Sequence, residues 1–197
     1  MITNYKSILS LFLLSLMLFS CKNEPGNSDT KEIENNESEE LSEEALLDTV
    51  QKQTLKYFWD YAEPNSGMAR ERYHPDGEYP KDDAHVVTTG GSGFGLMAIV
   101  AGMERKFIDR DSAVARLDKI AEFLDKAPRF HGVWPHWLNG ETGDVQAFSD
   151  KDNGGDIVET SFMAQGFIVV REYLKDGNEE EKAVARKYDE LWKGIEW

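Results

Sequence analysis

Two segments with helical character, residues 93–107 and 157–174, are apolar on nearly every side. A helix of this kind has to be covered all round by other elements. Three further segments, residues 45–62, 111–127 and 179–197, carry apolar side chains along one side at helical spacing and charged side chains opposite. The amphipathic segments alternate with the apolar ones along the chain. The sequence therefore predicts an all-α array of helices in the order outer, inner, outer, inner, outer.

The loops that enter the two apolar segments are long, whereas those that leave them are short. The long loops, residues 63–91 and 128–155, are rich in Trp, Tyr, His and Pro. Long loops of a compact domain are usually functional when they are not disordered, and this composition argues against disorder. Since neighbouring helices run antiparallel, both loops should emerge at one end of the array, where we expect the site. Residues 132–148 predict a β-hairpin with its turn at 139–143.

The N-terminus has the layout of a secretion signal, with an apolar stretch at residues 8–19 that is too short to span a bilayer. Leu18-Phe19-Ser20-Cys21 is similar to the lipobox of bacterial lipoproteins, which implies a signal peptide over residues 1–20 and lipidation of Cys21. The alternative is an ordinary signal peptide with an incidental thiol. Because Cys21 is the only cysteine, no disulfide is expected within the chain.

Residues 22–44 carry nine acidic side chains and two lysines. Residues 21–44 are therefore expected to form a solvated tether ahead of a domain that starts at residue 45. The expected location is the outer membrane of a Gram-negative bacterium, with the protein anchored by lipid and facing the periplasm or the cell surface. The chain has a net charge of −15, so nucleic acid is not an expected partner. We expect a monomer. The apolar ending LWKGIEW predicts that the chain is the N-terminal part of a longer protein or a truncated gene product.

The stretch SDKDNGGDIVETSF, residues 149–162, gathers four acids just before an apolar segment. A strict EF-hand loop is excluded because Ser161 stands where a bidentate Glu is required. The spacing makes Asp156 an N-cap and Glu159 the partner that completes a capping box. This structural interpretation leaves Asp150 and Asp152 unexplained.

A catalytic interpretation of the same stretch is also open. Asp156 and Glu159 would share one face of the first turn of an inner helix, with Asp152 across a double glycine. Glycosidic bond hydrolysis needs one protonated acid and one carboxylate, and three nearby acids make this possible. Asp152, Asp156 and Glu159 are therefore the candidate catalytic residues.

Candidate substrate contacts lie on both long loops. Trp134 and Trp137 have flat faces that stack on pyranose rings, with His131 and His136 as polar partners; the alternative is that the tryptophans pack the hairpin onto the helices. The two histidines lack the spacing of a zinc pair, and neither a metal nor a cofactor is expected.

The segment TTGGSGFGLM, residues 88–97, lacks the Lys of a P-loop and does not fit the dinucleotide fingerprint. Its glycines are expected to allow close helix packing. The free backbone N–H groups at the start of this helix, at Gly91 and Ser92, are expected to face the cavity and to bind substrate hydroxyls. Arg70-Glu71-Arg72, on the first long loop, is interpreted as surface charge.

Four stretches together resemble one enzyme family: VVTTGGSGFGLMAI, FHGVWPHWLNGETGDV, DKDNGGDIVETSFMAQG and LWKGIEW. They are similar to the glucoamylase-like family that includes the endo-β-1,2-glucanases of glycoside hydrolase family 144. The resemblance covers residues 45–197 and implies an (α/α)6 barrel, incomplete in this chain, that hydrolyses β-1,2-glucan with inversion and without a metal. It also implies that Asp152, Asp156 and Glu159 form the acidic cluster and that Trp134, His136 and Trp137 contact sugar.

The resemblance further implies an acid of the cleft beyond Trp197, so we predict that these 197 residues alone are inactive. Two alternatives to a lipid-anchored glycoside hydrolase stay open. One is a lipid-anchored glycan-binding protein without catalysis, whose acids only cap a helix. The other is an inactive fragment.

Overall fold

The computed structural model describes residues 41–147 and 149–197. This part of the chain contains helices α2 (Glu43–Trp59), α3 (Thr89–Glu104), α4 (Arg110–Lys126), α5 (Ile157–Leu174) and α6 (Glu179–Lys193), and strands β1 (Val86–Thr88) and β2 (Trp137–Asn139). All five predicted helices are confirmed. The predicted signal peptide, Cys21 and nearly all of the tether lie outside the described residues. No helix in the described ranges is both long and apolar enough to cross a membrane.

Side-chain caps define where the outer helices begin. The Asp109 carboxylate accepts a hydrogen bond of 2.9 Å from the Ser112 N–H at the start of α4. Asn178 and Glu181 form a reciprocal capping box at the start of α6. Each cap satisfies backbone donors that the first turn of a helix leaves without a partner. The caps let α4 and α6 start a few residues after α3 and α5 end, which is why these connections are short.

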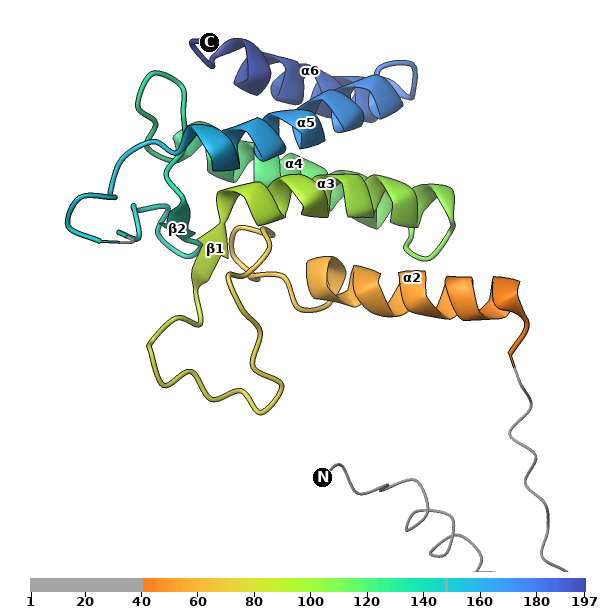
Figure 1. Ribbon diagram of the computed structural model, residues 1–197. Coiled ribbons are helices and arrows are strands. Elements are labelled where there is room, and N and C mark those ends of the chain that lie inside the picture. Colours follow the sequence, from red (N-terminus) through yellow and green to blue (C-terminus); the bar gives the residue numbers. More distant parts are fainter. Residues whose placement is uncertain (1–40, 148) are drawn as a thin grey trace, which may run out of the picture. The chain divides into compact units, whose positions relative to one another are not determined.

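Helices α3 and α5 run side by side in the same direction. In the view of Figure 1, α2 lies below them, α4 behind them and α6 above them. Two glycines allow the close approach of α3 and α5. A Cβ on Gly166 would lie 2.6 Å from the carbonyl oxygen of Gly93, so only glycine fits this crossing. The arrangement agrees with the predicted order of inner and outer helices.

The core lies where α3 and α5 meet α4 and α6. Its largest fully buried side chains include Trp134, Tyr188, Phe167, Leu96, Leu117 and Met163. Phe167 lies between the rings of Trp134 and Tyr188, with both ring centroids 5.5 Å from its own. The Tyr188 hydroxyl donates a hydrogen bond of 2.8 Å to the Leu117 carbonyl, so its polar end is satisfied inside the core.

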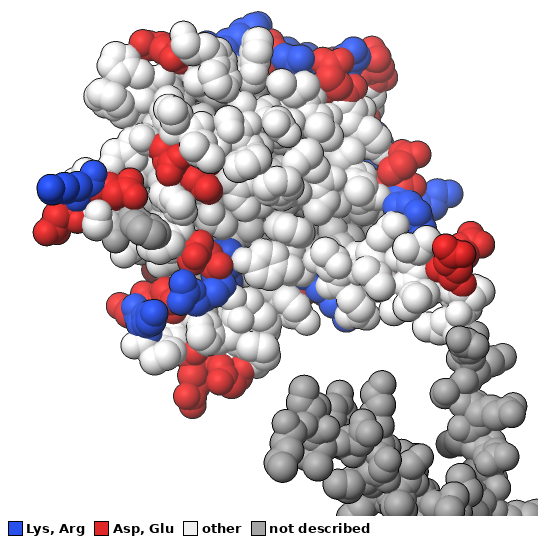
Figure 2. All heavy atoms as spheres, in the orientation of Figure 1, with Lys and Arg blue, Asp and Glu red and all other residues white. Residues whose placement is uncertain are grey.

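One side of the α3–α5 pair is uncovered, contrary to the expectation that apolar helices are enclosed on all sides. Figure 2 shows few charged side chains over these two helices. Phe94 on α3 is 48% exposed, and Ile157 and Val158 on α5 are 74% and 59% exposed. The reason is geometric: α2, α4 and α6 occupy the other sides of the pair, and these five helices form no closed ring.

The two long loops meet through a small sheet. Strand β2 pairs antiparallel with β1, with Thr88 opposite Trp137. The predicted turn is confirmed by a hydrogen bond of 2.8 Å from the Gly143 N–H to the Asn139 carbonyl. The predicted hairpin is only partly correct, because its returning arm makes a single bridge, between Leu138 and Val145. The main partner of β2 is β1, which places both loops at the N-terminal ends of α3 and α5 as predicted.

Candidate functional site

Asp156 caps α5, as predicted. One carboxylate oxygen accepts hydrogen bonds from the N–H groups of Val158 and Glu159, at 2.9 and 3.0 Å. The backbone N–H of Asp156 donates to the Trp134 carbonyl at 2.7 Å. Asp156 therefore joins the start of α5 to the second long loop.

The other carboxylate oxygen of Asp156 lies 3.1 Å from Nδ1 of His136. Partial burial raises the pKa of Asp156, but the hydrogen bonds from Glu159, His136 and Val158 outweigh it and hold the pKa below its usual value. The Asp156 side chain is consequently a carboxylate at neutral pH. It orients the His136 ring while it caps the helix.

Glu159 does not complete a capping box, so that part of the prediction is wrong. Its Oε2 accepts a hydrogen bond of 2.8 Å from the Gly90 N–H at the start of α3, and one of 3.3 Å from the Thr88 hydroxyl. The physical reason is that the Asp156 N–H, which a capping box would need, is already bonded to Trp134. The Glu159 side chain spans the gap between the first turns of the two inner helices.

Asp150 and Asp152 lie on the exposed loop that leads into α5. The Asp152 N–H donates to the Ser149 carbonyl at 3.0 Å, while its carboxylate makes no hydrogen bond or ion pair with the described residues. The loop is tied to the site by a bridge between Pro135 and Gly155. The structure thus brings Asp156 and Glu159 together on one helical turn and leaves Asp152 on the approach to it.

Trp137 lies on β2 and is half-buried. Its ring is edge-on to the His136 ring, with centroids 5.3 Å apart and an angle of 86°. Across the sheet it faces Thr88, the residue that contacts Glu159. A partly exposed indole in this position can stack on a sugar bound over the carboxylates.

The four other predicted substrate contacts are Trp134, Ser92, His131 and Gly91. Trp134 is fully buried and its indole N–H donates to the Leu124 carbonyl at 3.1 Å, so it packs the loop onto the helices, which was the alternative considered for it. Ser92 is buried and its hydroxyl accepts from the Ala69 N–H at 3.0 Å. His131 is exposed and pairs with Glu196 near the C-terminus at 2.8 Å. Gly91 is partly exposed in the first turn of α3.

Three residues at the site were missed from the sequence. Thr88 and Gly90 hold Glu159, and no spacing rule links them to a residue some seventy positions away. Glu71 accepts a hydrogen bond of 2.8 Å from the Trp137 indole, so its interpretation as surface charge is wrong. Its position between two arginines gave no indication of this partner.

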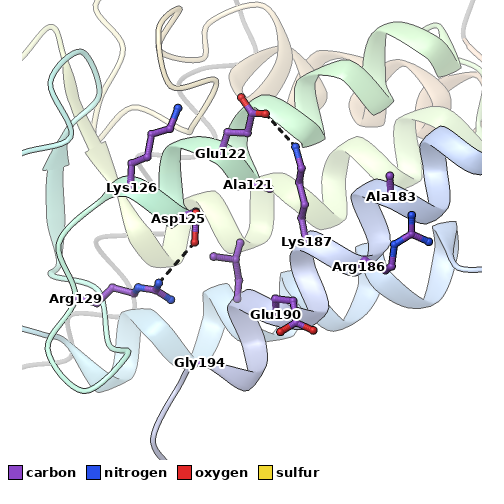
Figure 3. Close-up of a pocket in the computed structure, with 11 residues that line it drawn as sticks. Ala121, Glu122, Asp125, Lys126, Arg129, Ala183, Arg186, Lys187, Glu190 and Gly194 are labelled. Atoms are coloured by element: carbon purple, nitrogen blue, oxygen red, sulfur yellow. Dashed lines mark hydrogen bonds and ion pairs between the residues drawn. The ribbon is translucent and has the colours of Figure 1, made fainter.

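A hollow of about 620 Å³ lies away from these residues, between α4 and α6 (Figure 3). Its charged rim is largely self-paired. Lys187 bridges from α6 to Glu122 on α4 at 3.0 Å, and Arg129 lies 3.8 Å from Asp125. A groove of this kind forms where two amphipathic helices pack side by side. Because its charged side chains pair with one another, it gives no indication of a second site. The candidate site remains at the N-terminal ends of α3 and α5.

Residues 49–191 match a protein-family model described as "Protein of unknown function (DUF3131)". The chain belongs to the DUF3131 family. The match takes in α3, α4, α5, both long loops and most of α2 and α6. The candidate site of this DUF3131 chain therefore lies wholly inside the family region.

Relatives of this DUF3131 chain have names that state an activity. An exo β-1,2-glucooligosaccharide sophorohydrolase (non-reducing end) of Parabacteroides distasonis is 48% identical over 158 residues. Among solved structures, an endo-β-1,2-glucanase from Chitinophaga pinensis, in complex with sophorotriose and glucose, is 60% identical with a TM-score of 0.77. A β-1,2-glucanase from Parabacteroides distasonis is 47% identical with a TM-score of 0.73.

The chain is shorter than these relatives. The matched part is 80% of this DUF3131 chain but 21% of the sophorohydrolase. It is 79% of this chain and 37% of the Chitinophaga glucanase chain, and 80% and 22% for the Parabacteroides glucanase structure.

Proposed function

We propose that this protein is a glycoside hydrolase, or part of one, that cleaves β-1,2-linked glucans or their oligosaccharides. The observation that carries the proposal is the pair of carboxylates, Asp156 and Glu159, at the start of α5. They lie at the end of the helical array where the two long loops meet. The names of the relatives, at identities of 47–60%, support the β-1,2 linkage. Membership in glycoside hydrolase family 144 is part of the proposal.

The acidic residues have different roles in the proposed reaction. Asp156 has a lowered pKa and both of its oxygens accept hydrogen bonds, so it is unsuited to donating a proton to the leaving oxygen. We assign it the charged role, holding His136 and stabilising positive charge on the sugar ring. Glu159 and Asp152 are then the candidates for proton donor and for base that activates water. Inversion requires these two groups to act on opposite faces of the sugar.

Trp137 and His136 are the proposed sugar contacts. Trp137 offers a flat ring, and His136 offers a ring whose orientation Asp156 fixes. His131 and Gly91 stay as candidates at the edge of the loops. Trp134 and Ser92 are left out of the proposed site because both are buried.

We further propose that the five helices are part of an (α/α)6 barrel. The uncovered apolar side of α3 and α5 supports this proposal because further inner helices would enclose it. The TM-score of 0.77 to a protein that this chain covers only in part points the same way.

Product chromatography of the protein expressed from its complete gene tests the proposed function. The protein is incubated with β-1,2-, β-1,3- and β-1,4-glucans, beside its Glu159→Gln variant. Glu172→Gln, at the far end of the same helix, is the matched control. We expect short products from the β-1,2-glucan alone, lost by about a hundredfold or more in Glu159→Gln and retained in Glu172→Gln. Binding of β-1,2-glucan without products would instead favour the non-catalytic glycan-binding protein.

The proposed location is a lipid anchor at Cys21 in the outer membrane. Cells fed a labelled fatty acid should incorporate label into the protein, and Cys21→Ser should abolish this. Secretion without label would contradict the anchor and favour an ordinary signal peptide.

A further inference from the structure

Glu71 connects the first long loop to the aromatic residue of the candidate site. Its Oε2 accepts a hydrogen bond of 2.8 Å from Nε1 of Trp137. The Glu71 side chain is 25% exposed, so the bond is partly shielded from water and from salt. A carboxylate acceptor makes it stronger than a bond between neutral groups.

The rest of Glu71 is held from two sides. Its backbone N–H donates to the Val86 carbonyl on β1 at 2.8 Å. Its Oε1 lies 3.7 Å from Arg72, whose Nε lies 3.5 Å from Asp83. A glutamate on a free loop would lose several rotamers on binding an indole, but here the backbone bond and Arg72 restrict them beforehand.

Trp137 neighbours two residues, each of which contacts one of the two acids. Thr88, opposite Trp137 in the sheet, contacts Glu159. His136, the preceding residue, contacts Asp156 and lies edge-on to the indole. A rotation of the Trp137 ring would therefore change the surface directly beside the carboxylates.

We propose that Glu71 is a positioning residue that fixes the plane of the Trp137 ring for stacking on the sugar substrate. The sugar part of this inference rests on the proposed function. A ring fixed before binding loses little conformational entropy when the sugar arrives, so it contributes more to affinity than a mobile ring does. Glu71 acts through Trp137 and need not touch the sugar.

The contact itself is tested without any activity. The indole N–H resonance of Trp137 in the full-length protein is assigned by its loss in Trp137→Phe. We expect Glu71→Ala to move this resonance and Glu71→Gln, which keeps an oxygen acceptor, to move it less. Glu78→Ala, on the same loop and exposed, is the matched control and should leave it in place. A resonance that does not respond to Glu71→Ala overturns the inference.

The role in binding is tested by titration with a β-1,2-linked gluco-oligosaccharide. We expect Glu71→Ala to weaken binding by about fivefold to tenfold, the order of the cost of immobilising one side chain on binding, and Glu71→Gln to keep most of the wild-type affinity. In the Trp137→Phe background, Glu71→Ala should have no further effect, because the indole N–H is already absent.

Two binding outcomes overturn the positioning role. One is an unchanged affinity in Glu71→Ala although the resonance has moved. The other is a loss of affinity on Glu71→Ala that is equal in the wild-type and the Trp137→Phe backgrounds, which would mean that Glu71 contacts the sugar directly. A wild-type protein that neither binds nor cleaves the sugar overturns the proposed function and the sugar role with it, while the resonance still decides whether Glu71 orients Trp137.

Discussion

The carboxylate of Glu159, on the first turn of α5, accepts a hydrogen bond of 2.8 Å from the backbone N–H of Gly90, in the first turn of α3. The first turns of a helix carry partial positive charge and donors without helical partners. Glu159 therefore satisfies a backbone donor at the start of a helix other than its own. The contact fixes how the two inner helices meet at the candidate site, and it depends on Gly90 having no side chain.

Gly90→Ala should disable the site while leaving the fold intact. A Cβ at this position would lie 2.6 Å from Oε2 of Glu159, so the carboxylate has to move. Displacement of a catalytic group by about 1 Å costs about a hundredfold in rate. We expect hydrolysis of β-1,2-glucan by the full-length protein to fall by that order, with a change of only a few degrees in Tm.

Gly154→Ala is the matched control, because a Cβ there meets nothing within 4 Å. Its activity should stay within about twofold of wild type, a change of no more than a few tenths of a kcal/mol in activation free energy. Full activity in Gly90→Ala would show that the Glu159 contact is not needed for the reaction.

Asp156→Asn tests whether activity depends on the negative charge of Asp156 or only on its role as a helix cap. Asparagine caps helices about as well as aspartate, so the free energy of unfolding should fall by less than about 1 kcal/mol. The carboxylate that pairs with His136 is lost, and we expect activity to fall by about a hundredfold or more. Asp109→Asn makes the same change at the cap of α4 and should leave activity unchanged. Thermal melts and initial rates distinguish the two; equal rates in both variants would argue against a catalytic Asp156.

The helices could be predicted because apolar side chains recur at a helical period over long segments. The largest error at the start of a helix is at α3, which is predicted from residue 93 and begins at Thr89. The run Thr89-Gly90-Gly91-Ser92 has low intrinsic helix propensity. Close packing against α5 and the Glu159 contact require small residues there, and this tertiary requirement overrides the local preference.

The site could be predicted only as far as local spacing reaches. Asp156 lies directly before an apolar helix, and that position alone predicts its cap. Trp134 and Trp137 are three residues apart in the same loop, and composition cannot say which one is buried; the sheet with β1 decides it. The partners of Glu159 and Trp137 come from a different loop, so no local pattern contains them.

Glu63 should make the stability depend on pH. Its carboxylate is fully buried and accepts hydrogen bonds from Ser66 and Asn65, with His85 at 3.2 Å. Desolvation raises the pKa of Glu63, but these hydrogen bonds outweigh it and bring the pKa below its usual value of 4.5. A carboxyl group with a lowered folded-state pKa contributes stability above its unfolded pKa and loses it as the pH falls through its folded pKa.

Glu63→Gln should therefore lower the free energy of unfolding by about 1–3 kcal/mol at pH 7, the cost of disturbing a buried charged hydrogen-bond acceptor. As the pH falls from 4.5 through the lower folded-state pKa, Glu63 becomes protonated in the folded protein as well, and the two stabilities should converge. Urea unfolding at a series of pH values measures the difference. Glu78→Gln, on the same loop but exposed, should show no such difference, and a gap that stays constant down to pH 2 would contradict the assigned role of Glu63.

Gly166→Ala should destabilise the protein although alanine is the better helix former. In the interior of an unconstrained helix, this change stabilises by about 0.5–1 kcal/mol. Here the added Cβ would lie 2.6 Å from the Gly93 carbonyl oxygen and 3.0 Å from Leu96. Because backbone atoms on both helices would have to separate, we expect a loss of about 1–3 kcal/mol. Gln165→Ala, the exposed neighbour on α5, should change stability by no more than about 0.5 kcal/mol. A Gly166→Ala protein that melts higher than wild type would mean that α3 and α5 are not in this close contact.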